Sequence, residues 1–559
     1  MKRLPALFVL AALLGCAGSE PAPAPGELIQ PSAERANLFT TMLDNGLEVI
    51  LIRDARAPLV TIEMAVRNGA FAETPQTNGL AHFYEHMFFK GNRSLPDQSA
   101  YLARTRELGI DFNGITSNEA VRYYFTLPSG NLEAGLHFML DAVRFPSFNE
   151  DEIKTEIGAV LAEIDRAESV PSFRFHRAIS DALFYEYPER KNVLGDRAVV
   201  QRVTPEVLRR IRARFYVPNN AALILSGDLE PAAALAAARK VFDDWPRAAD
   251  PLAASAVPAH PPLTQPEQRI LDLAEVQTAT VRIVLQGPSV GRDPGATYAA
   301  DVLSFILSQK NARFQKTLVD SGTCLRAGLA YYTLAHTGPI YLSALVEPGK
   351  VDAAVSALLA EIDRLGDPDY FSDEELQRAK TRLWVAEQFD REDTEEYALA
   401  LGSWWCTTGI GYYLTYGERL RQVTRADIKA YLERYLIGKP RLVAVQVSQA
   451  AIDEHGIRFP GDGGPQAGVR SIGVEDPQTG IRPIGAGGPQ AGVRSIGVED
   501  PQTGIRPIGA GGPQAGARSA GCPREPLASV LPGPSCSDIA SRRAGRRPAD
   551  RPHTTEVQP

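Results

Sequence analysis

This chain of 559 residues has no excess of basic charge, few cysteines and few long apolar runs. The formal net charge is -8, and no basic patch carries interleaved aromatic residues, which argues against a nucleic-acid partner. The five cysteines show no zinc-ribbon spacing. The apolar stretch 4–14 is too short to span a bilayer as a stable helix. With 23% charged and 44% hydrophobic residues, the composition is that of a globular protein.

The first residues have the pattern of an export signal. Lys2 and Arg3 precede the short apolar stretch, and residues 13–16 (Leu-Leu-Gly-Cys) resemble a bacterial lipobox. In that class of signal the cysteine is lipidated, so we predict a signal peptide over 1–16, a lipid on Cys16 and a Pro/Ala-rich tether over 17–36. An ordinary secretory signal cut near Ala17 is the alternative. The resemblance implies anchoring to the outer membrane, facing the periplasm, in a Gram-negative source, and a cell-surface or secreted protein otherwise.

Between residues 37 and 455, segments typical of strands alternate with segments typical of helices, and this order occurs twice. In the first occurrence we predict strands at 47–52, 60–66, 123–127 and 221–225, and helices at 132–143 and 151–166. A Pro/Ala-rich linker over 248–266 follows. The second occurrence has a strand at 280–285 and helices at 297–307, 373–388 and 427–435. The pattern predicts two similar α+β domains, 37–247 and 267–455, each an antiparallel-rich sheet covered by helices.

The last part, residues 456–559, differs in composition. A segment that begins at Gly463 returns 24 residues later at Gly487 and begins again at Gly511. Its Gly, Pro and Gln content cannot bury enough apolar surface to fold alone, so we predict a disordered tail. The arginine pairs near its end suit a solvated tail, or contact with an acidic surface. Earlier in the chain, Cys324 and Cys406 could form a disulfide or remain two buried thiols.

Residues 82–86 read His-Phe-Tyr-Glu-His, the H-x-x-E-H order. On a helix, His82 and His86 are four residues apart and Glu85 lies on the same face. Two imidazoles and a carboxylate therefore converge where a zinc ion and its water could sit. An amphipathic helix with two packed histidines is the alternative interpretation.

A third zinc ligand has to come from another segment. Glu156 and Glu163 are seven residues apart in the helix predicted at 151–166, so they share one face. The apolar residues Ile157, Val160, Leu161 and Ile164 flank these two glutamates and would bury them. Because buried carboxylates need a cation or a donor, a metal would satisfy them.

These motifs resemble those of the pitrilysin-type zinc peptidases, the inverzincins that include insulin-degrading enzyme and the mitochondrial processing peptidase. The resemblance spans roughly residues 37–450 and adds landmarks at 43–47 (LDNGL), 79–82 (GLAH), 90–91 (KG) and 226–228 (SGD). In that family a glutamate 77 residues after the second histidine is the third ligand, which here is Glu163. A glutamate seven residues earlier, here Glu156, assists the site.

The resemblance implies a mitochondrial processing peptidase-like metallohydrolase fold and one Zn²⁺ per chain, held by His82, His86 and Glu163. It implies a zinc endopeptidase of unfolded peptides in which Glu85 is the general base and Glu156 orients a ligand or the water. Residues 113–119 resemble the family segment that leads into an edge strand beside the metal. A peptide could add to that edge by main-chain hydrogen bonds, with Asn113 in substrate binding, or Asn113 could be a plain turn residue.

One expected feature of active family members is missing. They use an Arg and a Tyr from the second half, in a segment like L-R-x-x-x-x-L-G-Y. Here Val319 stands at the Arg position, and Arg326 follows where the Tyr is expected; Tyr331 and Tyr332 have the wrong spacing.

The missing pair predicts a heterodimer in which a sister subunit supplies Arg and Tyr; a homodimer or a weakly active monomer is the alternative. The chain could also be a lipoprotein scaffold or binding module that keeps the fold without activity. The complete set of site residues speaks against a scaffold, which has no need of Glu85.

Overall fold

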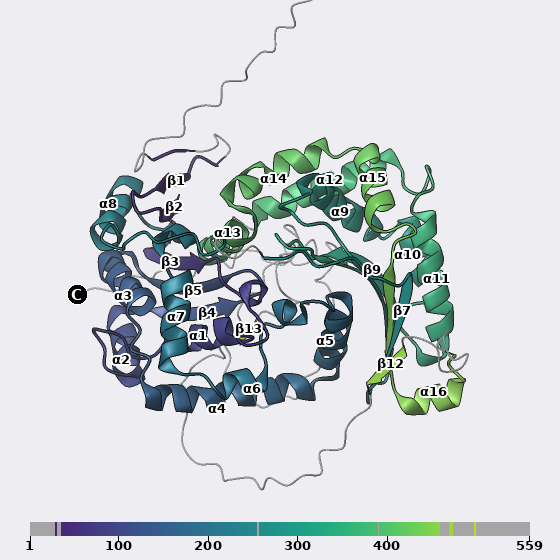
Figure 1. Cartoon of the computed structure of the whole chain (residues 1–559). Coiled ribbons are helices and arrows are strands. Elements are labelled where there is room, and N and C mark those ends of the chain that lie inside the picture. Colours follow the sequence, from purple (N-terminus) through teal and green to yellow (C-terminus); the bar gives the residue numbers. More distant parts are fainter. Residues whose placement is uncertain are drawn as a thin grey trace, which may run out of the picture.

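The structure is a computed structural model that describes residues 28–30, 35–253, 257–389 and 391–458, together with the backbone of 469–472 and 497–498. Two sheets, each covered by helices, lie side by side and form two halves of the molecule (Figure 1). The predicted α+β class with two sheet-and-helix domains is therefore confirmed. The signal peptide, most of the tether and most of the repeat tail lie outside the described residues.

The first sheet has the order β1-β2-β6-β3-β5-β4-β13. Its strands from the first half are β1 (Leu38–Met42), β2 (Glu48–Arg53), β3 (Leu59–Val66), β4 (Asp111–Thr116), β5 (Val121–Pro128) and β6 (Ala221–Gly227). All their pairings are antiparallel except that of β2 with β6. The central strands β3 and β6 are almost entirely buried, which suits the apolar run of β6; β3 also buries Thr61 and Glu63.

The described first half contains eight α-helices. They are α1 (Leu80–Phe88), α2 (Gln98–Leu108), α3 (Leu132–Arg144), α4 (Glu150–Ser169), α5 (Pro171–Leu183), α6 (Arg197–Val200), α7 (Pro205–Phe215) and α8 (Pro231–Phe242). The predicted helices at 132–143 and 151–166 correspond to α3 and α4. Each is within three residues of its expected bounds because amphipathic spacing fixes the buried face.

The second sheet has the order β12-β7-β11-β8-β10-β9. Its strands are β7 (Glu267–Leu273), β8 (Ala279–Gln286), β9 (Arg326–Tyr331), β10 (Pro339–Val346), β11 (Arg441–Val447) and β12 (Val469–Ile472). The β8, β9 and β10 pairings are antiparallel, and β7 runs parallel to β11. This repeats the arrangement of the first sheet, where β2 runs parallel to β6.

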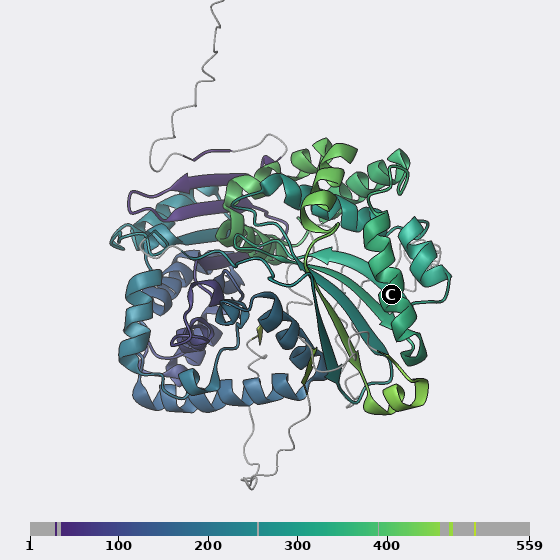
Figure 2. The ribbon, with the colours of Figure 1, turned by 45° about the vertical axis from the view of Figure 1, so that its right-hand side comes forward.

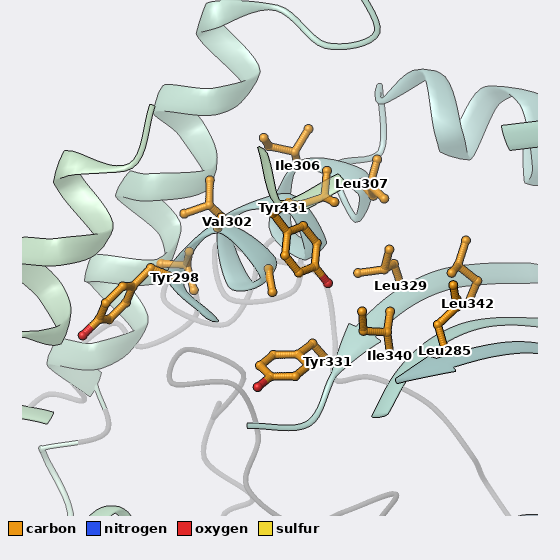
Figure 3. Packing of buried hydrophobic residues seen from close by; sticks show 14 of the residues in the cluster. Leu285, Tyr298, Val302, Ile306, Leu307, Leu329, Tyr331, Ile340, Leu342 and Tyr431 are labelled. Carbon is orange, nitrogen blue, oxygen red and sulfur yellow. The ribbon is translucent and has the colours of Figure 1, made fainter. Parts of the chain in front are cut away.

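Most helices of the second half lie on the outer side of its sheet, and α13 is the exception (Figures 1 and 2). They are α9 (Pro294–Leu307), α10 (Arg313–Gln315), α11 (Val351–Arg364), α12 (Asp373–Phe389), α13 (Thr394–Thr408), α14 (Ile410–Gln422), α15 (Arg425–Tyr435) and α16 (Gln449–His455). Val302 and Ile306 of α9 pack toward Leu329 and Ile340 of the sheet (Figure 3). Cys324 and Cys406 are buried and free, so they do not form the disulfide considered from the sequence.

Two helices cross between the halves. Helix α13 belongs to the second half but packs against β3 and β6 of the first sheet. There Trp405 donates its indole N–H to Glu48, and Arg67 lies over the Trp405 ring. Conversely, Phe175 and Ile179 of α5 join a cluster with strands of the second sheet. The halves are therefore held together by exchanged apolar surfaces.

Two short segments of the repeat tail are described. β12 lies parallel to β7, and β13 (Gly497–Val498) lies parallel to β4 at Ile115 and Thr116. The tail therefore contributes one edge strand to each sheet.

Candidate metal centre and active site

Helix α1 carries the H-x-x-E-H segment, and all nine of its residues are buried. Asn78, a residue type that often caps helices, precedes this helix, but Gly79 occupies the cap position and offers no side chain. The free backbone N–H groups of Gly79 and Ala81 donate to the buried carboxylate of Glu73. Burial raises the pKa of Glu73 to about 7, and these N–H groups oppose the rise. Glu73, which the sequence analysis missed, therefore fixes the start of the motif helix.

The two histidines and Glu163 meet at one point. His82 Nε2 and His86 Nε2 are 3.2 Å apart. Glu163 Oε2 lies 3.6 Å from His82 Nε2 and 3.5 Å from His86 Nε2. A tetrahedral zinc ion with ligands at about 2.0–2.1 Å separates them by about 3.3–3.4 Å. The triangle therefore has the size of a zinc site before any adjustment.

Helix α4 brings both predicted glutamates to this point. The Asn149 side chain accepts the N–H groups of Asp151 and Glu152 and so caps the helix. Val160 and Ile164 are fully buried, as the flanking pattern predicted, while Ile157 and Leu161 are partly buried. Glu156 and Glu163 share the face that contacts α1.

Glu156 contacts His86 at the ring nitrogen that points away from the triangle of His82, His86 and Glu163. Its Oε1 lies 2.7 Å from His86 Nδ1, and its Oε2 lies 2.5 Å from Lys90 Nζ. Burial raises the pKa of Glu156, but the His86 and Lys90 contacts outweigh it and leave that pKa below its ordinary value. A carboxylate on the outer nitrogen of a histidine fixes the ring so that the inner nitrogen can bind a metal. Lys90 was noted in the sequence only as a landmark.

The charges at the triangle also suit a cation. Burial lowers the pKa of His82 far below its ordinary range, so this ring is neutral. His86, by contrast, has its pKa raised to about 9: burial lowers it, and the hydrogen bonds to Glu156 and Glu163 more than offset that. The surroundings therefore stabilise positive charge at this point. A divalent ion ligated by two neutral imidazoles and Glu163 would provide that charge.

Glu85 lies beside the triangle and is fully buried. Burial raises the pKa of Glu85 to about 7, with His86 and Thr116 opposing the rise. Thr116 of β4 donates its hydroxyl to Glu85 Oε2 at 2.5 Å, whereas Oε1 has no partner among the described residues. Strand β4 passes so close that a Cβ on Gly114 would lie 2.9 Å from Glu85 Oε1. Gly114 and Thr116 lie within residues 113–119, but their contact with Glu85 was not predicted.

The remaining predicted residues lie elsewhere. Asn113 is on β4 opposite Tyr124, and its Oδ1 accepts the backbone N–H of Gly114 at 2.9 Å. In the second half, Val319 packs against the core. The Tyr331 hydroxyl donates to the Pro288 carbonyl. The structure thus gives no replacement for the missing Arg–Tyr pair at these two positions.

Comparison with known proteins identifies the family. A family model described as Insulinase (Peptidase family M16) matches residues 48–197, and one described as Peptidase M16 inactive domain matches residues 202–383. The chain belongs to peptidase family M16. The H-x-x-E-H helix and Glu163 both fall in the first matched segment, and Val319 falls in the second.

Relatives in family M16 include proteins named as zinc proteases. An uncharacterized zinc protease of Streptomyces coelicolor is 24% identical over 420 residues, which is 72% of this chain and 88% of that protein. A probable mitochondrial-processing peptidase subunit beta of Arabidopsis thaliana is 24% identical over 400 residues, 68% of this chain and 71% of that protein. Several other relatives are matched over 50% of their length or less.

Solved structures of the same fold include the first half of the periplasmic protease PqqL from Escherichia coli. It superposes with a TM-score of 0.64 at 21% identity, covering 76% of this chain and 94% of that one. At this identity the likeness shows the fold alone. Among the helices of the described residues, none combines the length and apolarity that crossing a membrane requires.

Proposed function

We propose that this M16 chain is a zinc-dependent endopeptidase, or the zinc-bearing subunit of one, that hydrolyses unfolded peptides. The observation that carries the proposal is the triangle of His82, His86 and Glu163 with Glu85 next to it. A scaffold would gain nothing from burying an acid without a partner for Oε1, because such burial costs stability.

Each residue has a distinct role in this proposal. His82, His86 and Glu163 would hold one zinc ion, which when bound supplies a Lewis acid that activates water and polarises the scissile carbonyl. Glu156, itself paired with Lys90, keeps the His86 ring in its ligating orientation.

Glu85 is the proton carrier. A general base works best when its pKa is near the operating pH, and burial places that of Glu85 at about 7. Thr116 holds one oxygen of the carboxylate and leaves Oε1 to accept a proton from water and return it to the leaving amine.

Strand β4 is the proposed substrate edge. It passes over Glu85. The edge of β4 that faces away from β5 can form main-chain hydrogen bonds, because β13 pairs with Ile115 and Thr116 along it. An extended peptide bound in the same way would place its backbone beside the metal and be selected weakly by its side chains. We assign Asn113 to substrate binding, although its hydrogen bond to Gly114 also suits a local turn role.

We further propose that a sister subunit completes the site. Val319 and Tyr331 are both engaged in packing, so the second half offers no Arg–Tyr pair at these positions. Relatives of this chain are named as beta subunits of the mitochondrial-processing peptidase, which fits a paired enzyme. A homodimer is the alternative.

The export pattern supports a location outside the cytoplasm, with a lipid on Cys16. If Cys16 is lipidated, the full chain should incorporate radiolabelled palmitate and a Cys16→Ser variant should incorporate none. A wild-type chain that takes up no label would rule out the anchor and leave an ordinary secreted protein.

The test of the peptidase proposal combines metal analysis with peptide cleavage. The purified chain, alone and mixed with a candidate sister subunit, is measured for zinc content and for cleavage of fluorogenic peptides. Glu85→Gln should keep zinc and lower kcat by about 10²- to 10⁴-fold. Glu150→Gln, an exposed glutamate at the start of α4, is the matched control and should change neither. A chain that binds no zinc and cleaves nothing in either form would instead support the scaffold hypothesis.

A further inference from the structure

Helix α12 exposes an unusual group of apolar side chains near its end. Trp384 is 40% exposed, Val385 37% and Phe389 54%. They are three of the eight large apolar residues exposed in the described part of the chain. Their spacing of one and five residues places them on one side of the helix. A stripe of this kind on the outside of a globular protein marks a contact surface.

The inner side of α12 is already occupied. Leu376, Ala379 and Leu383 are buried, and the helix packs against α9 and α14. The apolar residues on the outer side are therefore additional to those that fold the helix. A helix that only covered the second sheet would carry polar residues there.

Positive charge accompanies these aromatic residues. Arg378 and Arg382 are exposed on the same outer side. Arg378 also pairs with Glu374 at 3.8 Å and donates to Gln309, whereas Arg382 makes no ion pair with any described residue. Asp373, Glu374 and Glu375 are confined to the first turn. From residue 377 to 389 the single acidic residue is Glu387, which is buried. An exposed helix segment with Arg, Trp and Phe, and with no exposed acid between residues 377 and 389, is typical of helices that lie on anionic membranes.

The start of the described chain reaches this end of α12. Arg35 forms a buried ion pair with Glu387 at 2.6 Å and donates to the Tyr413 carbonyl at 3.2 Å. Helices α12 and α14 lie on the same side of the molecule as β1 in both views (Figures 1 and 2). Cys16 precedes Arg35 by 19 residues, which span at most about 65 Å when fully extended. A lipid on Cys16 would therefore keep this side of the molecule within that distance of a bilayer.

We propose that the outer face of α12, formed by Arg378, Arg382, Trp384, Val385 and Phe389, rests on an anionic lipid bilayer. The aromatic rings enter the headgroup region and the two guanidinium groups contact phosphates. This contact sets the orientation of the protein on the membrane. The side of the molecule opposite α12 then points away from the bilayer. The proposal does not depend on peptidase activity, and it is tested without the lipid anchor.

The tryptophans provide a specific readout. All four tryptophans lie in the described residues, and Trp245, Trp404 and Trp405 are buried. Emission that responds to vesicles therefore comes from Trp384. The full chain with Cys16→Ser is mixed with vesicles of phosphatidylcholine, or of equal parts phosphatidylcholine and phosphatidylglycerol. With the anionic vesicles we expect a blue shift of Trp384 emission, quenching by brominated lipid, and co-sedimentation.

Variants distinguish binding through this face of α12 from non-specific binding of the protein to vesicles. Trp384→Ser with Phe389→Ser should weaken binding to the anionic vesicles by roughly tenfold or more. Arg382→Glu, which keeps Trp384 as a reporter, should weaken binding roughly tenfold. Leu325→Ser removes an apolar side chain that is 46% exposed just before β9, and it should have no effect. Since all these residues are exposed, the Tm of each variant should match that of the parent.

Two results would overturn the proposal. One is a Trp384 that stays fully quenchable by acrylamide when anionic vesicles are present, or vesicle binding that survives the double substitution. The other is a change in the mass measured by sedimentation when Trp384 and Phe389 are replaced, because the face would then be an interface between protein chains.

Discussion

The close passage of β4 over the base can be tested by adding a single methyl group at Gly114. A Cβ at this position would lie 2.9 Å from both Cγ and Oε1 of Glu85, and 3.0 Å from the Phe89 ring. Ordinary van der Waals contact begins at 3.4 Å, so Gly114→Ala forces Glu85 and the strand apart by about half an ångström. The backbone at Gly114 is not left-handed, so the substitution acts through this contact and not through backbone strain.

This displacement of Glu85 should lower the rate of peptide hydrolysis without lowering the zinc content. Glu85 is held at 2.5 Å by Thr116 of the same strand, and a shift of this size breaks that alignment. A misplacement of about 1 Å at a reacting group costs about 10²-fold in rate. We therefore expect kcat/KM for a fluorogenic peptide to fall by roughly 10²-fold in Gly114→Ala. Zinc content should not change, because none of the three ligands is touched.

Gly328 supplies the matched control. It lies in strand β9 of the second half, and a Cβ there would meet nothing within 4 Å. Gly328→Ala should keep kcat/KM within about twofold of the wild type. If Gly114→Ala retains full activity with an unchanged Tm, the position of Glu85 is not critical and its assignment as base fails. If zinc is lost together with activity, the methyl group acts on the ligands and the argument is also refuted.

Three further predictions follow from the structure. Lys90→Met leaves buried Glu156 without its cation, so zinc affinity measured by competition with a chelator should fall about 10- to 100-fold. Burial raises the pKa of Asp301 to about 7 against an ordinary 3.8, so the folded chain keeps a proton that the unfolded chain releases. The free energy of unfolding should therefore fall by up to about 4 kcal/mol as the pH rises from about 4 to 7, and Asp301→Asn should remove that fall in denaturant titrations at several pH values. Ending the chain at residue 458 removes β13 from the edge of β4, so kcat/KM for added peptides should rise. An unchanged or lower value, with zinc content intact, would show that β13 does not compete with substrate at β4.

Secondary structure followed the sequence wherever one face of an element is buried. The helix predicted at 373–388 is α12 (Asp373–Phe389), and the strand predicted at 280–285 is β8 (Ala279–Gln286). Local pattern failed at the start of α1, where the partner comes from the turn just before the helix. Asn78 resembles a helix cap, but Glu73 takes the N–H groups, because the chain turns back before α1 and places a carboxylate there.

The sequence by itself determined the family resemblance, the α+β class and the set of candidate ligands. Those depend on residue type and on spacing, and spacing along a helix fixes which side chains share a face. The tertiary structure alone decided that His82, His86 and Glu163 form a triangle of zinc dimensions, and that Lys90 and Thr116 support it. It also decided the packing of α13 on the first sheet and the outer face of α12. These features arise where distant segments meet, and no periodicity within one segment records which surface another segment will cover.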